Sequence, residues 1–381
     1  MKSYDIVIVG AGSIGMATGY YLAKMGVNVL MIDANDPPHD KGSHGGDTRL
    51  IRHAYGEGRS YTPLALKSQM LWNQLQIQTH REIFKQTGVL NIGPEKSDFM
   101  EEIKKSAELY RLTVENLDHD AITLRYPGLT LMDKPKLEGC LEPESGVLYV
   151  DQCLTTYREL ALKEGTELIV NTAVIDLELR NQQAKVTTAA QTFICDQVLI
   201  AAGAWQVEWF KKLQLDTPLT VKRQVIGWFE ADPALFDLSV FPGFTAETED
   251  GLFYGFPSID GSGVKVGRHD YGEPVNPNDF ERDFSRYPQD EAVLRQFLEK
   301  WMPNAAGALI KGKTCLYTMT DDEDFIVDQH PQYKQVWLAA GFSGHGFKFA
   351  SGVGQGLAEL MADGKSATDL SLFSLKRFLE R

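Results

Sequence analysis

Short apolar runs alternate with stretches of helical spacing along the whole chain. Residues 4–9 are mostly apolar and of strand length, as expected for a strand buried on both faces. Residues 13–25 show helical spacing, and residues 27–32 form a second apolar run. A strand, a helix and a second strand in this order are typical of an α/β fold.

The same alternation continues to the end of the chain. Helical spacing predicts helices over 61–78, 97–112 (capped by Ser97), 151–161 (capped by Asp151) and 291–301. Apolar or alternating runs predict strands over 88–93, 146–150, 170–186, 197–202, 221–230, 251–256, 313–319, 325–328 and 336–340. Residues 113–140, rich in proline and glycine, read as irregular.

The turn after the first strand carries candidate chemistry. Gly10 allows a tight turn, Gly12 lets a pyrophosphate approach the backbone, and Gly15 lets the helix pack close to the strand. The helix start at Ser13 presents free N–H groups to phosphates. Asp33 closes the second strand, where a carboxylate accepts from ribose hydroxyls and repels a 2′-phosphate. The pattern predicts a dinucleotide site, either FAD or NAD, against a plain structural turn as the alternative.

Composition and charge narrow the class of protein. The chain has 381 residues, 43% of them hydrophobic, and a net charge of −14, which disfavours nucleic acid and anionic membranes as partners. No apolar run approaches the ~20 residues that span a bilayer. The first strand begins within four residues of the N-terminus, leaving no space for a signal peptide, so we expect a cytoplasmic protein. Four scattered cysteines without metal-like spacing indicate a reducing compartment and no metal: Cys140, Cys153, Cys195 and Cys315.

A polar, glycine-rich segment at 42–49 follows the second strand. It contains Ser43, His44 and Thr48, and its place after that strand puts it near the ligand crevice of a dinucleotide fold. Arg49 and Arg52 would share one face of a helical turn and need anions there, which flavin oxygens, phosphate or a substrate carboxylate would supply. A solvated surface loop is the alternative.

Two more glycine turns follow buried strands. Gly203 ends the strand over 197–202 and lets the backbone approach a ligand. The turn over 341–348 enters a helix and forms a second anion site, with Lys348 adding a full charge. Three glycines within that helix indicate close packing on a ligand or a strand: Gly352, Gly354 and Gly356.

Other candidates are ambiguous from the pattern alone. Lys265 alternates with valines and reads as an outward-facing lysine, and His269 reads as a turn histidine. Cys315 reads as a buried structural cysteine.

Five motifs together carry a family resemblance. They are GAGSIG (10–15), GSHGGDTR (42–49), FYGFP (253–257), TCLY (314–317) and GFSGHGFKF (341–349). The chain resembles the monomeric sarcosine oxidases, and the related N-methyl-tryptophan oxidases, of the D-amino-acid-oxidase-like flavoproteins. The resemblance implies a Rossmann-like FAD-binding domain (1–60, 146–215 and 320–381) interleaved with an antiparallel-sheet substrate domain (61–145 and 216–319).

The resemblance also implies roles for individual residues. FAD is expected to be attached covalently through Cys315, and Arg52 and Lys348 are expected to hold a substrate carboxylate. Lys265 is expected to face the flavin and activate oxygen, with Arg49 nearby. Tyr254, His269 and Tyr317 are expected to line the substrate cavity. The cofactor-binding residues expected are Gly10, Gly12, Ser13, Gly15, Asp33, Ser43, His44, Thr48, Arg49, Gly203, Cys315, Gly344, His345, Gly346 and Lys348.

The implied reaction is oxidative demethylation by a monomeric oxidase: sarcosine, water and O2 give glycine, formaldehyde and H2O2. Oxidation of N-methyl-tryptophan or of a cyclic imino acid such as proline or pipecolate is the alternative within the family. An NAD-dependent dehydrogenase and a non-enzymatic flavin-bound module are alternatives of other classes. The chain departs from the family pattern at Gly45, where a second histidine is expected, and at Thr245, where a larger apolar residue is expected; Thr245 makes the pocket roomier or more polar.

Overall fold

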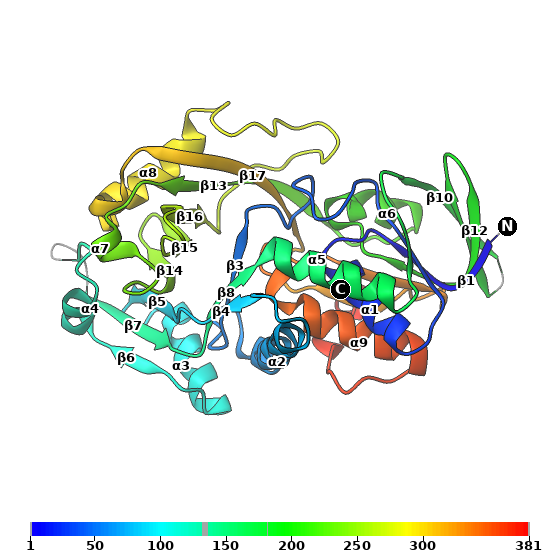
Figure 1. Cartoon of the computed structure of the whole chain (residues 1–381), viewed down its shortest axis with the longest axis horizontal. Helices are drawn as coiled ribbons and strands as arrows, with labels where there is room; N and C mark the ends of the chain where they lie inside the picture. Colours follow the sequence, from blue (N-terminus) through cyan, green and yellow to red (C-terminus); the bar gives the residue numbers. More distant parts are fainter. Residues whose placement is uncertain (1, 132–135, 181, 380–381) are drawn as a thin grey trace.

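The computed structural model describes residues 2–131, 136–180 and 182–379. Two large sheets lie toward opposite ends of the long axis of the molecule (Figure 1). In the part of the chain that the structure describes, each of these sheets has eight strands, and a three-stranded sheet of β3 (Thr48–Ile51), β8 (Gly146–Tyr149) and β4 (Phe84–Lys85) lies apart from them.

The first sheet is built around parallel strands close to the N-terminus. β1 (Lys2–Val9) pairs in parallel with β2 (Val29–Ile32) and with β12 (Thr192–Ile200), and its residues 6–9 are all buried. The remaining strands are β9 (Glu167–Ile169), β10 (Val174–Arg180), β11 (Gln183–Thr188), β18 (Ile326–Gln329) and β19 (Val336–Ala340). A strand buried on both faces needs helices to cover it, and this explains its nearly continuous apolar sequence.

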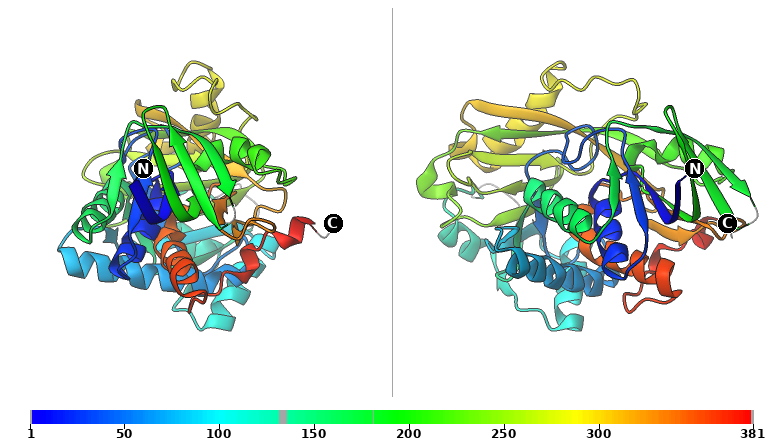
Figure 2. Two further views of the ribbon diagram at one scale, coloured as in Figure 1. Left: turned by 90° about the vertical axis from the view of Figure 1, so that its right-hand side faces the viewer. Right: turned by 45° about the vertical axis from the view of Figure 1, so that its right-hand side comes forward.

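Helices α1 (Ser13–Lys24), α2 (Thr62–Thr79), α5 (Val150–Lys163) and α9 (Ala350–Asp363) share the core of this region. Figure 2 shows α1 and α9 side by side from two further directions. A Cβ at Gly354 would lie 2.6 Å from the Cβ of Ala17 in α1, and one at Gly352 would lie 2.5 Å from Ser68 Oγ in α2. The expectation that the glycines of this helix pack on a ligand or a strand is therefore wrong: Gly352 and Gly354 let α9 approach α2 and α1, and a Cβ at Gly356 would meet the side chain of Leu370 at 2.9 Å.

The second sheet is antiparallel except for one pair of strands. Its order is β17 (Leu309–Met319), β13 (Thr220–Phe229), β16 (Val264–Arg268), β15 (Gly251–Phe256), β14 (Gly243–Thr248), β5 (Val89–Pro94), β7 (Leu137–Glu142) and β6 (Glu115–Leu117). Only β14 and β5 run parallel among these described pairs. α8 (Gln289–Trp301) packs its Leu294 and Phe297 into the core of this sheet.

The remaining helices are short or lie at the edges: α3 (Asp98–Tyr110), α4 (His119–Arg125), α6 (Gln206–Lys212), α7 (Pro233–Phe236) and α10 (Lys376–Leu379). Ser97 caps α3 as predicted, accepting from the N–H of Met100. Asp151 lies in the first turn of α5 and does not cap it, because that helix already begins at Val150. The segment 113–140 is not irregular throughout: Asp118 caps α4, with β6 before it and the start of β7 after, while 132–135 lie outside the described residues.

The strands of the first sheet come from 2–32, 167–200 and 326–340, and those of the second from 89–142 and 220–319. We propose that these two sets of segments form the predicted FAD-binding and substrate domains. The prediction put 61–78 in the substrate domain, but we count α2 with the FAD-binding domain because Trp72 and Leu75 belong to the core of the first sheet. Among the described residues, none of the helices combines the length and the apolar character needed to cross a bilayer.

Candidate active site

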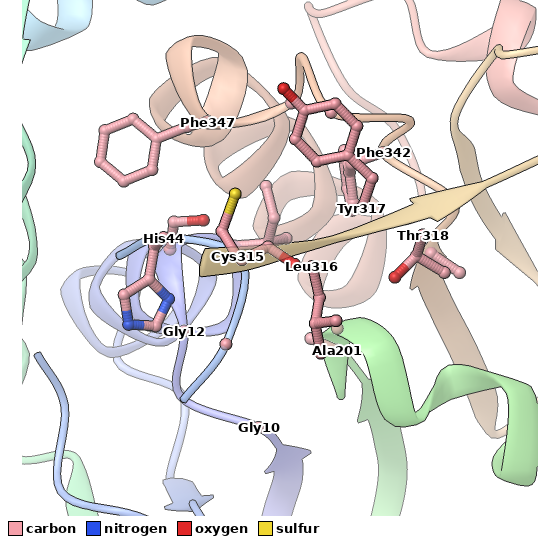
Figure 3. Close-up of a pocket in the computed structure, with 18 of the residues that line it drawn as sticks. Gly10, Gly12, His44, Ala201, Cys315, Leu316, Tyr317, Thr318, Phe342 and Phe347 are labelled. Atoms are coloured by element: carbon pink, nitrogen blue, oxygen red, sulfur yellow. The ribbon is translucent and has the colours of Figure 1, made fainter. Parts of the chain in front are cut away.

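One cavity of about 620 Å³ extends from the first sheet to the second. Figure 3 shows part of its wall, with Cys315 and Tyr317 on the same side of β17 and His44 beside the turn at Gly10 and Gly12. Most of the residues predicted from the sequence line it: Gly10, Gly12, Ser13, Asp33, Ser43, His44, Arg49, Arg52, Gly203, Tyr254, His269, Cys315, Tyr317, Gly344, His345, Gly346 and Lys348. Three others lie outside this lining: Gly15, Thr48 and Lys265.

The turn from β1 into α1 forms one end of the cavity. Gly10 has a φ of 97°, in the region that favours glycine, and a Cβ there would meet Ala201 O at 2.4 Å. A Cβ at Gly15 would lie 1.9 Å from Gly10 O, so this glycine brings the helix onto the turn. Gly12 caps α1 without a side-chain hydrogen bond, leaving the first N–H groups of the helix to face the cavity.

Asp33 lies at the same end and is buried. Its Oδ2 accepts from Ala11 N at 2.7 Å and its Oδ1 from Asn35 N at 2.8 Å, with His39 Nε2 at 3.5 Å. Burial alone would raise the pKa of Asp33, but the bonds from His39, Asn35 and Ala11 outweigh burial and lower it. The carboxylate is therefore ionised, as an acceptor for ribose hydroxyls requires.

The glycine-rich segment supplies the side wall. His44 is buried against Gly12, burial lowers its pKa to about 3, and its Nε2 has no hydrogen-bond partner among the described residues. Arg49 lies in strand β3, so the expectation that it shares a helical face with Arg52 is wrong. Its guanidinium donates to Ser43 O at 2.9 Å and to Gly45 O at 2.6 Å, which fixes the loop around the cavity.

Two buried cations face the middle of the cavity. Arg52 is 4% exposed, and its Nη2 lies 2.5 Å from both carboxylate oxygens of Glu57. Lys348 donates to Tyr55 Oη at 3.1 Å and to His345 O at 3.0 Å, which leaves one N–H without a partner among the described residues. Sequence reasoning missed Glu57, although an acid between two glycines and five residues after Arg52 was a usable signal.

The charge of Lys348 changes with pH near neutrality. Burial, together with the charge of Arg52, lowers its pKa to about 7, while Glu57 acts in the opposite direction. Tyr55 Oη lies 2.8 Å from His345 Nδ1, and His345 Nε2 lies 3.2 Å from Glu323 O. Since a carbonyl only accepts, the proton of His345 lies on Nε2, and Tyr55 donates to Nδ1 and accepts from Lys348. Burial lowers the pKa of His345 to about 3, so the imidazole is neutral.

The alternation of strand residues places the other predicted groups on one face of the second sheet. Phe256 and Trp228 both lie opposite Lys265, and Cys315 lies opposite Gln224. Since Tyr254 shares a face of its strand with Phe256, and Gln224 with Trp228, the side chains of Tyr254, Lys265 and Cys315 project to the same side. A Cβ at Gly267 would come within 2.7 Å of the Tyr254 ring. Similarly, a Cβ at Gly344 would overlap the Tyr317 ring, at 2.2 Å. Both glycines make room for an aromatic wall, a role the sequence alone did not indicate for Gly267.

Lys265 is not the outward-facing lysine that its pattern suggests, because it is 2% exposed. Its Nζ donates to Gly46 O at 2.6 Å, Thr48 O at 2.8 Å and Thr48 Oγ1 at 3.0 Å. Burial and the Arg49 guanidinium hold the pKa of Lys265 well below its usual range. The three neutral acceptors match the three donors of an ammonium and therefore oppose this shift, and through them Lys265 can hold a positive charge just behind the wall.

Cys315 and His269 complete the chamber. Among the described residues that line the cavity, Cys315 is the one cysteine. Burial raises the pKa of its thiol, while the charges of Arg49 and Lys265 act in the opposite direction. The His269 ring lies 5.6 Å from that of Tyr317, and burial lowers the pKa of His269, which keeps it neutral.

These features fit a bound FAD. The start of α1 has no side-chain cap and can bind phosphates, and the ionised Asp33 can accept from ribose hydroxyls. The buried Nε2 of His44, which has no partner among the described residues, can bind a polar atom of the dinucleotide. The same cavity continues into a chamber with cations and aromatic rings. A nucleotide site and a substrate chamber in one cavity define a cofactor-dependent oxidoreductase of the dinucleotide-binding class.

Comparisons with known proteins identify the family within that class. The pattern of the family described as "FAD dependent oxidoreductase" (DAO) matches residues 5–360, and the chain belongs to this family. It is 48% identical over 376 residues to "Monomeric sarcosine oxidase" of Bacillus sp. (strain B-0618), covering 98% of this chain and 96% of that one. It is 38% identical to "N-methyl-L-tryptophan oxidase" of Yersinia pestis (strain Pestoides F), covering 98% and 99%.

Solved structures agree on the fold. The chain matches NikD, an amino acid oxidase essential for nikkomycin biosynthesis, with a TM-score of 0.85 and 23% identity over 98% of both chains. It matches glycine oxidase from Geobacillus kaustophilus with a TM-score of 0.82 and 21% identity over 99% of both chains. The protein is therefore an FAD-dependent oxidoreductase, and the expected α/β fold is confirmed.

Proposed function

We propose that the protein is an oxidase of N-methyl amino acids, with the sarcosine reaction as its type: sarcosine, water and O2 give glycine, formaldehyde and H2O2. The observation that carries the proposal is the pair of buried cations, Arg52 and Lys348, in the cavity that begins at the dinucleotide turn. Relatives named for sarcosine and for N-methyl-L-tryptophan share almost the full length of the chain and support it. An NAD-dependent dehydrogenase finds no support among these comparisons.

Arg52 and Lys348 would bind the substrate carboxylate. A guanidinium offers two parallel donors and the free N–H of Lys348 adds a third, each a charge-assisted bond. Because the carboxylate of Glu57 already pairs with Arg52, the substrate carboxylate must either displace Glu57 or bind Arg52 beside it. The carboxylate thereby fixes the amine end of the substrate relative to the cofactor.

The other wall residues would orient the substrate and stabilise charge. When bound, FAD would accept two electrons as the substrate loses one hydrogen from the carbon next to its nitrogen and a proton from the nitrogen, so that C–N becomes C=N, and the two electrons and two protons would reduce O2 to H2O2. Tyr254 and Tyr317, whose hydroxyls lie 3.5 Å apart, and the neutral His269 would exclude water and position the amine. Lys265, held behind the wall with Arg49 nearby, would favour the reduction of O2 electrostatically.

The cofactor would be held at both ends of the cavity. Gly10, Gly12 and Ser13 would bind the pyrophosphate and Asp33 the ribose, while the wall of Ser43, His44 and Gly203 would approach the flavin. The turn at Gly344, His345 and Gly346 leads into a second helix and would stabilise negative charge on the reduced ring. Gly15 and Thr48 would act indirectly, through helix packing and through Lys265.

We further propose that the FAD is attached covalently through Cys315, that the protein is monomeric and that it works in the cytoplasm. The place of Cys315 in the cavity wall, beside the charges of Arg49 and Lys265, supports the linkage. Acid precipitation should leave the yellow colour in the pellet, and free flavin in the supernatant would contradict the attachment.

A peroxide assay tests the function. Purified protein should release H2O2 with sarcosine, N-methyl-alanine or N-methyl-tryptophan, and with proline or pipecolate if cyclic imino acids fit. Absence of peroxide with all five would contradict the proposal.

A further inference from the structure

One wall of the chamber carries a buried hydroxyl in an otherwise aromatic surface. Thr245 in β14 lines the cavity, is 5% exposed and lies opposite Tyr254 on the neighbouring strand. Its Oγ1 lies 2.7 Å from Asn91 Oδ1, and Asn91 is itself fully buried on β5. The direction of this hydrogen bond determines what the hydroxyl can offer a ligand.

The groups behind Asn91 fix that direction. Asn91 Nδ2 lies 2.9 Å from Glu142 Oε1 and 3.3 Å from Cys140 O. The carbonyl can only accept, and Glu142 also accepts at Oε2 from the N–H groups of residues 53 and 54 and from Ser145 Oγ. The amide nitrogen of Asn91 must therefore face Glu142, and its oxygen must face Thr245.

The hydroxyl proton of Thr245 is consequently committed to Asn91. What remains on Oγ1 is acceptor capacity, because a hydroxyl has one donor and two lone pairs. This wall therefore offers the chamber a hydrogen-bond acceptor and no donor at Thr245.

The same network ties this acceptor to the carboxylate clamp. Glu142 binds the backbone immediately after Arg52 through one oxygen and Asn91 through the other. Thr245 and Arg52 are thus held in fixed relation by one buried carboxylate. In an amino acid the side chain leaves the carbon next to the carboxylate, so a carboxylate held by the clamp directs a short side chain into the cavity that Thr245 also lines.

Resting on the function proposed above, we propose that Thr245 is a specificity-determining residue that accepts a hydrogen bond from the substrate side chain. The preferred substrates are then N-methyl amino acids with a short side chain ending in a donor, such as a hydroxyl. Apolar side chains of the same size gain no bond there, and a side-chain carboxylate meets an acceptor instead of a donor at Thr245, in a cavity that Glu57 also lines.

The test compares two side chains of nearly equal size, the hydroxymethyl of N-methyl-L-serine and the ethyl of N-methyl-L-2-aminobutyrate. The wild-type holoenzyme should favour the serine compound in kcat/KM by roughly two- to tenfold, the range of one net hydrogen bond. Thr245→Val should abolish that ratio and Thr245→Ser should keep it. Thr248→Val is the matched control, because Thr248 lies on the same strand, is absent from the cavity lining and bonds Gly251 O.

Using the ratio makes the result independent of any loss of stability that Thr245→Val causes by leaving Asn91 without a donor. A wild-type enzyme that favours the ethyl compound would overturn the inference, even if Thr245→Val does not fold. An unchanged ratio in Thr245→Val would also overturn it, while oxidation of both compounds would leave the proposed function standing. If neither of the two compounds nor sarcosine reduces the flavin, the proposed function is contradicted, and this inference with it.

Discussion

The two ends of the cavity attract anions by different means. At the turn into α1 the positive potential comes from backbone N–H groups of residues close together in sequence, and no lysine or arginine is needed. In the substrate chamber it comes from Arg52, Lys265 and Lys348, which belong to three distant segments. The potential of the backbone N–H groups does not change with pH, whereas that of the chamber depends on the two lysines, whose pKa values burial has lowered. Binding of the cofactor phosphates should therefore be insensitive to pH and to side-chain charge, and catalysis should be sensitive to both.

The largest expected effect is on the chamber. Lys265→Met removes the buried ammonium and should slow reoxidation of the reduced enzyme by O2 by roughly 10²-fold or more, because preorganised charge is lost where negative charge develops. Stopped-flow mixing of the reduced protein with O2 measures this. Anaerobic reduction by sarcosine should stay close to the wild-type rate, and equal loss of both half-reactions would contradict a specific role of Lys265.

Lys348→Ala should weaken substrate binding by about 1–3 kcal/mol, the value of a charge-assisted hydrogen bond. The dissociation constant of sarcosine, taken from anaerobic reduction at increasing concentration, checks it. Lys300→Ala is the matched control, since it removes the same charge from an exposed ion pair with Asp250. Equal dissociation constants of sarcosine in the two variants would contradict a role of Lys348 in binding the carboxylate.

Substitutions at two glycines of the nucleotide turn should have different effects, one on stability and the other on cofactor binding. Gly15→Ala places a methyl 1.9 Å from Gly10 O and should lower the free energy of unfolding by about 1–3 kcal/mol. Gly12→Ala places its methyl 3.6 Å from His44 Nδ1, in ordinary contact, so the protein should fold normally but bind less FAD. Denaturation curves and the flavin-to-protein absorbance ratio test the pair. Equal stability losses would contradict the assignment of Gly12 to the cofactor.

The pH dependence should be confined to the chamber. Lys348 has a pKa near 7 in the free protein, so it is charged below that pH and neutral above it. The dissociation constant of a simple carboxylate such as propionate should therefore rise by up to about tenfold per pH unit above 7, as flavin absorbance titrations would show. A constant value from pH 6 to 9 would contradict the clamp.

The sequence was most informative where structure is local. The strand–turn–helix unit, the acid at Asp33 and the cap at Ser97 depend on neighbours in the chain, and the structure has each at the expected place. The pairing of Arg52 with Glu57 and the burial of Lys265 depend on tertiary contacts that no spacing encodes. For Arg49, spacing alone misled, because pairing of β3 with β8 makes that segment extended. The family resemblance, not periodicity, pointed to Lys265 and Cys315.

The central claim is that an FAD in this cavity faces a cationic clamp for a carboxylate. It is tested most directly by adding sarcosine, or its amide in which a neutral group replaces the carboxylate, to the purified protein without air and following flavin absorbance. Sarcosine should bleach the flavin at low concentration and the amide only at far higher concentration. Equal bleaching by both compounds, or none by sarcosine, would contradict the claim.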